Sequence, residues 1–201
     1  MKERPIIFST EMVRAILEGR KTQTRRIVKY DVDTTTYDLF YWHPENHNDK
    51  THSAIGIYGW RKTGLIYYGV CPYGKSGDRL WVRESFVYAG TLDPGYLIYK
   101  ANYPDCVPKH LENIPSIDKI KWKASIFMPR NVARIILEIT NIKVQRLQDI
   151  TEEDAKAEGV FIHRVYPASR MEFANLWDSI HKKIYRWKDN PWVWVIEFKK
   201  L

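Results

Sequence analysis

The feature that most constrains the fold of this chain is a series of short runs rich in β-branched and aromatic residues, each bounded by turn residues. Such runs predict strands at 6–8, 65–70, 79–86, 133–144 and 192–199. In the last two, alternating side chains predict at least one buried face. Many short strands with few helices are typical of a β-barrel.

Two short helices are expected beside these strands. The first covers about 11–18, with Thr10 as its N-cap and Gly19 in the left-handed position that commonly ends a helix. The second begins at Thr151 and ends at Gly159. Both predictions depend on residues that mark the ends of a helix, so they specify where each helix begins and ends.

A third helix is expected from a capping box formed by Ser169 and Glu172. Helical spacing places four apolar residues of this helix on one face, and that spacing predicts a core-facing stripe: Phe173, Leu176, Trp177 and Ile180. Residues 31–63, in contrast, are polar and without periodicity, which predicts a long loop.

Composition indicates one globular domain over residues 1–201. The chain is 44% hydrophobic and 28% charged, and no repeat or flexible linker divides it. No apolar run approaches the ~20 residues that a membrane span requires, and the first residues lack the apolar core of a signal peptide. We therefore expect a cytoplasmic protein without membrane partners.

The cysteines and histidines predict no metal or other cofactor. Cys71 and Cys106 have no CxxC partner and are expected to be plain thiols in a reducing compartment. His43, His47 and His52 are loosely spaced in a polar stretch and are expected to be solvated.

The charge of the chain favours an anionic partner. Lys and Arg number 32 against 24 acidic residues, which gives a net charge of +8 and an isoelectric point near 9.3. Eight Trp and thirteen Tyr add aromatic faces on which a base can stack. A nucleic acid or a phosphate-bearing ligand is therefore one candidate partner.

Residues 19–26 combine two hydroxyls with four cations directly after the predicted stop of the first helix. A rigid element that ends here would fix the backbone while leaving the side chains accessible. The segment can hold an anion, activate a hydroxyl, or form an ordinary solvated turn.

The pattern Gly19-x-Lys21-x-x-Thr24-x-Arg26 resembles the signature of the ASCH domain. ASCH domains are small β-barrels related to the PUA domains that bind RNA. The resemblance implies an α+β fold, with a small PUA-like barrel flanked by two or three helices.

Three further stretches agree with this family in order along the chain. Residues 76–84 resemble its turn-and-strand segment, 147–159 its second helix and 194–199 its last strand. The family does not account for about 31–75 and 88–120, which are expected to be long loop insertions into the single domain.

The resemblance is closest to bacterial amidohydrolases that remove acyl groups from the exocyclic N4 of cytidine. In these enzymes the Lys and Thr of the first motif act with a Glu of the second helix, which corresponds to Lys21, Thr24 and Glu158. Many other ASCH domains have an acid in place of Thr24, so the hydroxyl favours the hydrolytic branch. The implied substrate is a modified pyrimidine nucleoside.

The implied chemistry gives each residue a role. Thr24 would be the nucleophile, and Lys21, if neutral, its base. Burial and neighbouring arginines would lower the pKa of Lys21, whereas Glu158 would raise it. Glu158 would bind the cytosine amine and relay a proton to the leaving nitrogen. Arg26 is expected to give structural support, to stabilise the oxyanion or to contact a phosphate, and further substrate contacts are expected from Arg20, Arg25 and Glu84.

Two features of the sequence bear on this assignment. Glu158 falls near the end of its predicted helix, where the helix dipole disfavours a carboxylate by ~0.3–1 kcal/mol. Lys21 and Thr24 are three residues apart and would face opposite sides of a regular strand, so their pairing requires a bend. Alternative functions are an RNA-binding module without catalysis and a ribonuclease.

Overall fold

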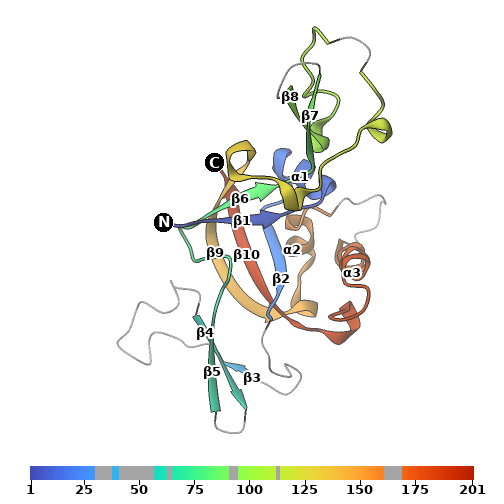
Figure 1. Ribbon diagram of the computed structural model, residues 1–201. Helices are drawn as coiled ribbons and strands as arrows, with labels where there is room; N and C mark the ends of the chain where they lie inside the picture. The colour runs from blue at the N-terminus through green and yellow to red at the C-terminus, as the bar shows by residue number, and fades with distance from the viewer. Residues whose placement is uncertain (30–37, 41–56, 63–64, 91–94, 112–113, 161–168) are drawn as a thin grey trace.

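The computed structural model describes residues 1–29, 38–40, 57–62, 65–90, 95–111, 114–160 and 169–201 of the chain. These residues form a mixed α+β fold (Figure 1). Within them, no helix is both long enough and apolar enough to cross a membrane.

The described residues contain three α-helices and ten strands. The helices are α1 (Thr10–Leu17), α2 (Glu152–Ala157) and α3 (Ser169–Ile180). The strands are β1 (Glu3–Ile7), β2 (Gln23–Ile27), β3 (Asp38–Phe40), β4 (Ile57–Lys62), β5 (Leu65–Val70), β6 (Arg79–Arg83), β7 (Phe86–Ala89), β8 (Tyr96–Tyr99), β9 (Ile136–Arg146) and β10 (Trp192–Lys200). All five predicted strands are present, although the run at 79–86 is divided into β6 and β7.

The main sheet has five strands in the order β1-β6-β9-β10-β2. β1 and β6 are parallel, and the other neighbours are antiparallel. Strand β10 lies inside this sheet and is buried on both faces, because its alternate side chains enter two different hydrophobic clusters.

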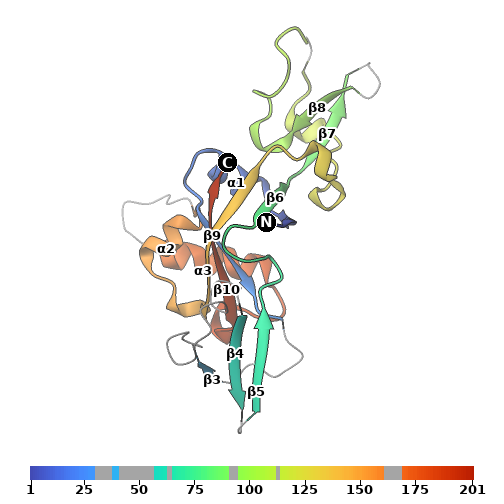
Figure 2. The same ribbon diagram turned by 90° about the vertical axis from the view of Figure 1, so that its left-hand side faces the viewer.

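Helices cover the two faces of β10. Val193 and Val195 pack with Phe173 and Trp177 of α3, whereas Ile196 packs in the cluster that contains residues of α1. Figure 2 shows α2 and α3 together beside the sheet, with α1 near the end where β6 and the C-terminus lie. The sheet therefore separates two parts of the core.

The edge strands β1 and β2 are joined by a side chain. Arg26 of β2 donates a hydrogen bond from Nη2 to the carbonyl of Ile7 at 2.7 Å, and its guanidinium lies 5.3 Å from the centroid of the Phe8 ring. The described residues include no backbone ladder between these strands, so by strand pairing the sheet is open.

Two smaller β-structures extend from the main sheet. The sheet β3-β4-β5 and the hairpin β7-β8 lie at opposite ends of the molecule (Figure 1). A strand was predicted at 65–70, where β5 lies, but the expectation of long loops is wrong for β3, β4 and β8. Each of these strands has six residues or fewer, too few to show a clear period within a polar stretch.

The first helix ends as predicted but begins with a different cap. The hydroxyl of Ser9 accepts a hydrogen bond from the backbone N–H of Met12 at 3.3 Å, so Ser9 caps α1, not Thr10. Thr10 is the first helical residue. Gly19 has φ +75°, which confirms the predicted left-handed position.

The cap signals of α2 are confirmed, and those of α3 are not. Thr151 accepts from the N–H of Asp154 at 3.1 Å, and Gly159 has φ +79°. Ser169 is the first residue of α3, and its buried hydroxyl has no hydrogen-bond partner among the described residues, so no box with Glu172 forms there.

The apolar stripe of α3 is only partly in the core. Phe173 and Trp177 are buried as predicted. Ile180 is 55% exposed, and Leu176 lines a cleft. Helical spacing identified the stripe correctly but did not define how far along the helix the core extends.

Candidate active site

The turn after α1 brings Lys21 against the end of α2. The backbone N–H of Lys21 donates to the carbonyl of Ala15 at 3.0 Å, and Lys21 forms an isolated antiparallel bridge with Glu158. A Cβ at Gly159 would lie 2.8 Å from the Cβ atoms of both Ala15 and Lys21. Glycine is therefore required at 159 for its positive φ and for this close approach.

The ammonium of Lys21 is buried, and three acceptors surround it. Nζ donates to the carbonyl of Gln23, to the carbonyl of Glu158 and to Oε2 of Glu158, each at 2.8 Å. The side chain has 0% exposure. Because an ammonium has three donors, the protonated form is fully satisfied here.

Burial lowers the pKa of Lys21, and the nearby carboxylate of Glu158 opposes this effect. The positive charges of Arg26 and Arg25 lower it further. The direction is the one that a general base requires, since only the neutral amine can accept a proton.

The carboxylate of Glu158 pairs with two buried cations. Oε1 lies 3.1 Å from Nη1 of Arg25, while Oε2 contacts Lys21. Arg25 also donates from Nη2 to Asp154 at 2.8 Å, and Asp154 accepts from Gln23 at 3.0 Å. These pairings offset the helix dipole, which disfavours a carboxylate at this end of α2.

Thr24 lies on the opposite face of β2 from Gln23 and Arg25. It pairs with Ile196, which faces the cluster containing residues of α1. Thr24 is 3% exposed and makes no side-chain hydrogen bond within the described part of the chain.

Lys21 lies at the edge of the sheet, near the face on which Thr24 lies. Its Nζ lies 5.5 Å from the centroid of the Phe8 ring, and the guanidinium of Arg26, on the same face as Thr24, lies 5.3 Å from it. Lys21 precedes β2 by two residues and is not part of a regular strand. The rule that would place Lys21 and Thr24 on opposite faces of a regular strand therefore does not apply to Lys21.

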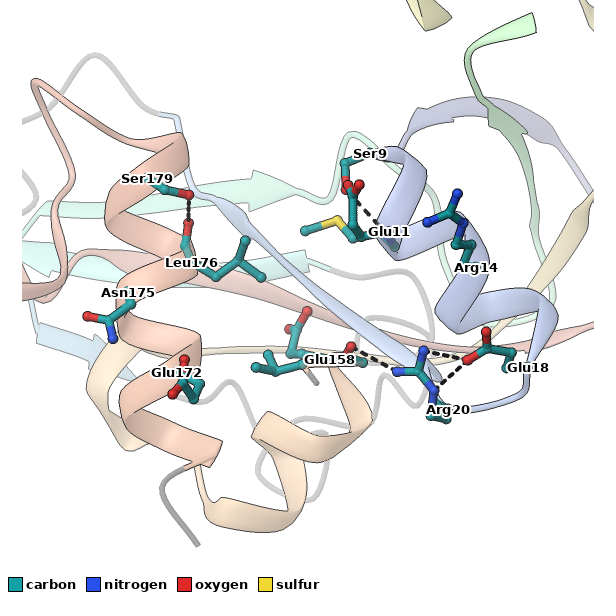
Figure 3. Close-up of a pocket in the computed structure, with 13 residues that line it drawn as sticks. Ser9, Glu11, Arg14, Glu18, Arg20, Glu158, Glu172, Asn175, Leu176 and Ser179 are labelled. Carbon is teal, nitrogen blue, oxygen red and sulfur yellow. Dashed lines mark hydrogen bonds and ion pairs between the residues drawn. The ribbon is translucent and has the colours of Figure 1, made fainter. Parts of the chain in front are cut away.

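A cleft of about 710 Å³ opens between α1 and α3. Figure 3 shows these helices as its two walls, with Glu158 between them at the end of α2. Met12 and Leu176 supply apolar surface on opposite walls, and Ser9, Asn175 and Ser179 supply hydrogen-bonding groups.

The predicted site residues differ in their access to this cleft. Glu158 and Arg20 line it. Lys21, Thr24 and Arg25 are each less than 5% exposed and are not among the lining residues. Of the three proposed catalytic residues, only Glu158 lines the cleft, and its carboxylate, which is 4% exposed, is bound by Lys21.

Glu84 does not lie in the cleft. Its carboxylate is bound through both oxygens by Arg134, at 2.9 Å each. Arg134 in turn stacks 4.0 Å from the centroid of the Tyr99 ring in β8. In this arrangement Glu84 links the main sheet to the β7-β8 hairpin.

The arginines of residues 19–26 are bound within the protein. Arg20 donates to Glu18 at 2.7 Å and to the carbonyl of Gly159 at 3.2 Å. Arg25 is held by Asp154 and Glu158, and Arg26 by Ile7. The segment therefore differs from the solvated basic turn that composition alone allows.

The site has two contributors that the sequence patterns did not identify. Asp154 precedes Glu158 by four residues, so both carboxylates face β2 from one side of α2, and this spacing was a usable signal. Gln23, which holds Asp154, gave no signal of its own. Among the described residues, no group of three or more His, Cys, Asp or Glu side chains is placed to hold a metal ion.

Comparisons of the chain with models of known families, with curated proteins and with solved structures find no match.

Proposed function

We propose that this protein is an amidohydrolase that removes acyl groups from the exocyclic N4 of modified cytidine or cytosine. The observation that carries the proposal is the buried Lys21–Glu158 pair, at 2.8 Å, placed directly behind the floor of a cleft. A buried lysine with a lowered pKa beside a carboxylate is typical of a catalytic site.

The cleft suits a small ligand. Its volume of about 710 Å³ falls within the range of ~300–1,000 Å³ found for small-molecule sites. Met12 and Leu176 can pack against a pyrimidine ring from opposite walls, and Glu158 can accept a hydrogen bond from its exocyclic nitrogen.

The proposed reaction begins at Thr24. Neutral Lys21 accepts the hydroxyl proton while the oxygen attacks the acyl carbonyl, and the C–N4 bond breaks as the acyl ester forms on Thr24. The proton passes from Lys21 through the contact with Glu158 to N4, so that cytidine leaves as the free amine.

Water completes the cycle. Lys21, neutral again, takes a proton from a water molecule as that water attacks the acyl ester. The ester bond then breaks, the acyl group leaves as a carboxylic acid, and Lys21 returns the proton to the hydroxyl oxygen of Thr24. Thr24 is 3% exposed and is not among the residues that line the cleft, which makes it the decisive position to test.

We also propose that the main sheet is the core of a PUA-like barrel of the ASCH type. The sheet curves so that its two edge strands approach, and Arg26 joins them. The matching motif places Lys21, Thr24 and Arg26 on the segment that enters and forms β2.

The binding of Arg25 and Arg26 within the protein favours hydrolysis over the two alternatives. An RNA-binding module or a ribonuclease would need cations of this segment free to meet phosphates. Here Arg25 and Arg26 hold carboxylate and backbone oxygens instead.

The test is release of cytidine from N4-acetylcytidine, followed by chromatography. Wild-type protein should release cytidine, and Thr24→Ala should lose this activity. Thr22→Ala is the matched control, because Thr22 is an exposed threonine two residues away. Equal activity of Thr24→Ala and wild type would exclude Thr24 as the nucleophile, and no release by wild type would exclude the proposed function.

A further inference from the structure

The charged side chains that line the cleft are mostly acidic, although the chain as a whole carries a net charge of +8. The charged lining residues are Glu11, Glu18, Glu158, Glu172, Arg14 and Arg20. Carboxylates therefore outnumber guanidinium groups in the one region where the proposed substrate would bind.

Of the two guanidinium groups, Arg20 has a carboxylate partner and Arg14 has a neutral one, so Arg14 keeps its positive charge. Arg14 donates from Nε to the carbonyl of Ala101 at 2.6 Å, and Arg20 pairs with Glu18. The Glu158 carboxylate is balanced by Lys21 and Arg25. The paired groups of Glu18, Arg20 and Glu158 therefore contribute little net charge toward the cleft.

Glu11 and Glu172 differ from these residues. Glu11 lies on α1 and Glu172 on α3, the two walls of the cleft (Figure 3). Within the described part of the chain, neither carboxylate forms an ion pair. In that part of the chain, the uncompensated charges of the cleft lining are therefore these two carboxylates, one on each wall, and the single guanidinium of Arg14.

We propose that Glu11 and Glu172 make the cleft selective for uncharged nucleosides over nucleotides and polynucleotides. This inference rests on the proposed function, which places the exocyclic nitrogen at Glu158. The sugar must then extend between α1 and α3, where a 5′-phosphate is repelled by both carboxylates. Sugar hydroxyls, in contrast, can donate hydrogen bonds to the same carboxylates.

Binding separates this inference from catalysis. Calorimetric titration of the Thr24→Ala protein with N4-acetylcytidine and with its 5′-monophosphate compares the two ligands without turnover. At low ionic strength the nucleoside should bind at least about tenfold more tightly than its 5′-monophosphate, and added salt should reduce the ratio of the two affinities.

Charge variants identify the source of the preference. The double change Glu11→Gln and Glu172→Gln, in the same background, should bring the ratio of the two affinities close to one. The matched control is Asp149→Asn with Glu153→Gln, which alters net charge equally at exposed positions outside the cleft. That control should retain the preference.

Three results would overturn the inference: equal affinities, tighter binding of the monophosphate, or no binding of either ligand. If the ratio of the two affinities changes equally in both double variants, the inference is also overturned, because the net charge of the protein would then be the cause. Nucleoside-selective binding by a protein that releases no cytidine would remove the hydrolase proposal and leave this inference standing.

Discussion

Glu158→Gln should destabilise the fold as well as impair catalysis. The change preserves shape but removes the negative charge shared by the Lys21 ammonium and the Arg25 guanidinium, whose side chains both have 0% exposure. Arg25 keeps Asp154 at 2.8 Å, so most of the cost falls on Lys21, which keeps only two carbonyl acceptors.

The magnitude follows from that burial. Removing one partner of a buried ion pair costs ~3–5 kcal/mol. Because burial already lowers the pKa of Lys21, the variant can reduce the cost by releasing the proton, and we expect a loss near the lower end, about 3 kcal/mol at pH 7.

The pH dependence has a definite sign. With the carboxylate gone, the pKa of Lys21 in the folded state falls further below its unfolded value of ~10.4. Between these two values the unfolded chain binds more protons, so stability rises with pH, by at most ~1.4 kcal/mol per pH unit. The variant should therefore recover part of its stability as the pH approaches 10.

Urea unfolding followed by tryptophan fluorescence, at pH 7 and near pH 10, measures both effects. Glu153→Gln, an exposed change on the same helix, is the control and should alter stability by less than ~0.5 kcal/mol. A loss below ~1 kcal/mol for Glu158→Gln, independent of pH, would refute the reasoning, since it would mean that Glu158 does not compensate a buried charge.

Three other predictions follow from the same geometry. Lys21→Ala and Thr24→Ala should each abolish cytidine release, and their double mutant should be hardly slower than either; additive losses would show that they serve different steps. Lys21→Arg keeps the charge but cannot give up its proton, so the folded variant should lose at least ~10²-fold in rate, and near-normal turnover would exclude a base role. Gly159→Ala should cost ~1–3 kcal/mol more in thermal unfolding than Gly77→Ala, because both positions have positive φ but only the first would push a Cβ to 2.8 Å from Ala15; equal costs would contradict the contact.

Local signals were enough to predict part of the fold. Strand β10 was recognisable because it is a run of β-branched and aromatic residues, and α2 because Thr151 and Gly159 mark its ends. Long-range pairing was not accessible in this way. The sheet β3-β4-β5 depends on partners rather than on the pattern within each short strand.

The candidate site shows the same limit. Lys21 and Glu158 are 137 positions apart, and within the sequence only the family resemblance relates them. The cleft depends on how α1 packs relative to α3, which no sequence pattern encodes locally. The burial of Arg25 and the partial burial of Arg26 also came from tertiary contacts, since four cations in eight residues suggest a solvated turn.

The pH profile of cytidine release from N4-acetylcytidine, with enzyme-free samples as the blank, tests the central claim most directly. If Lys21 is the base that activates Thr24, kcat/KM should rise with pH and reach a plateau below the ordinary lysine value of ~10.4, and Lys21→Ala should abolish release at every pH. Absence of release by wild type at any pH, or a flat profile shared with Lys21→Ala, would contradict the account.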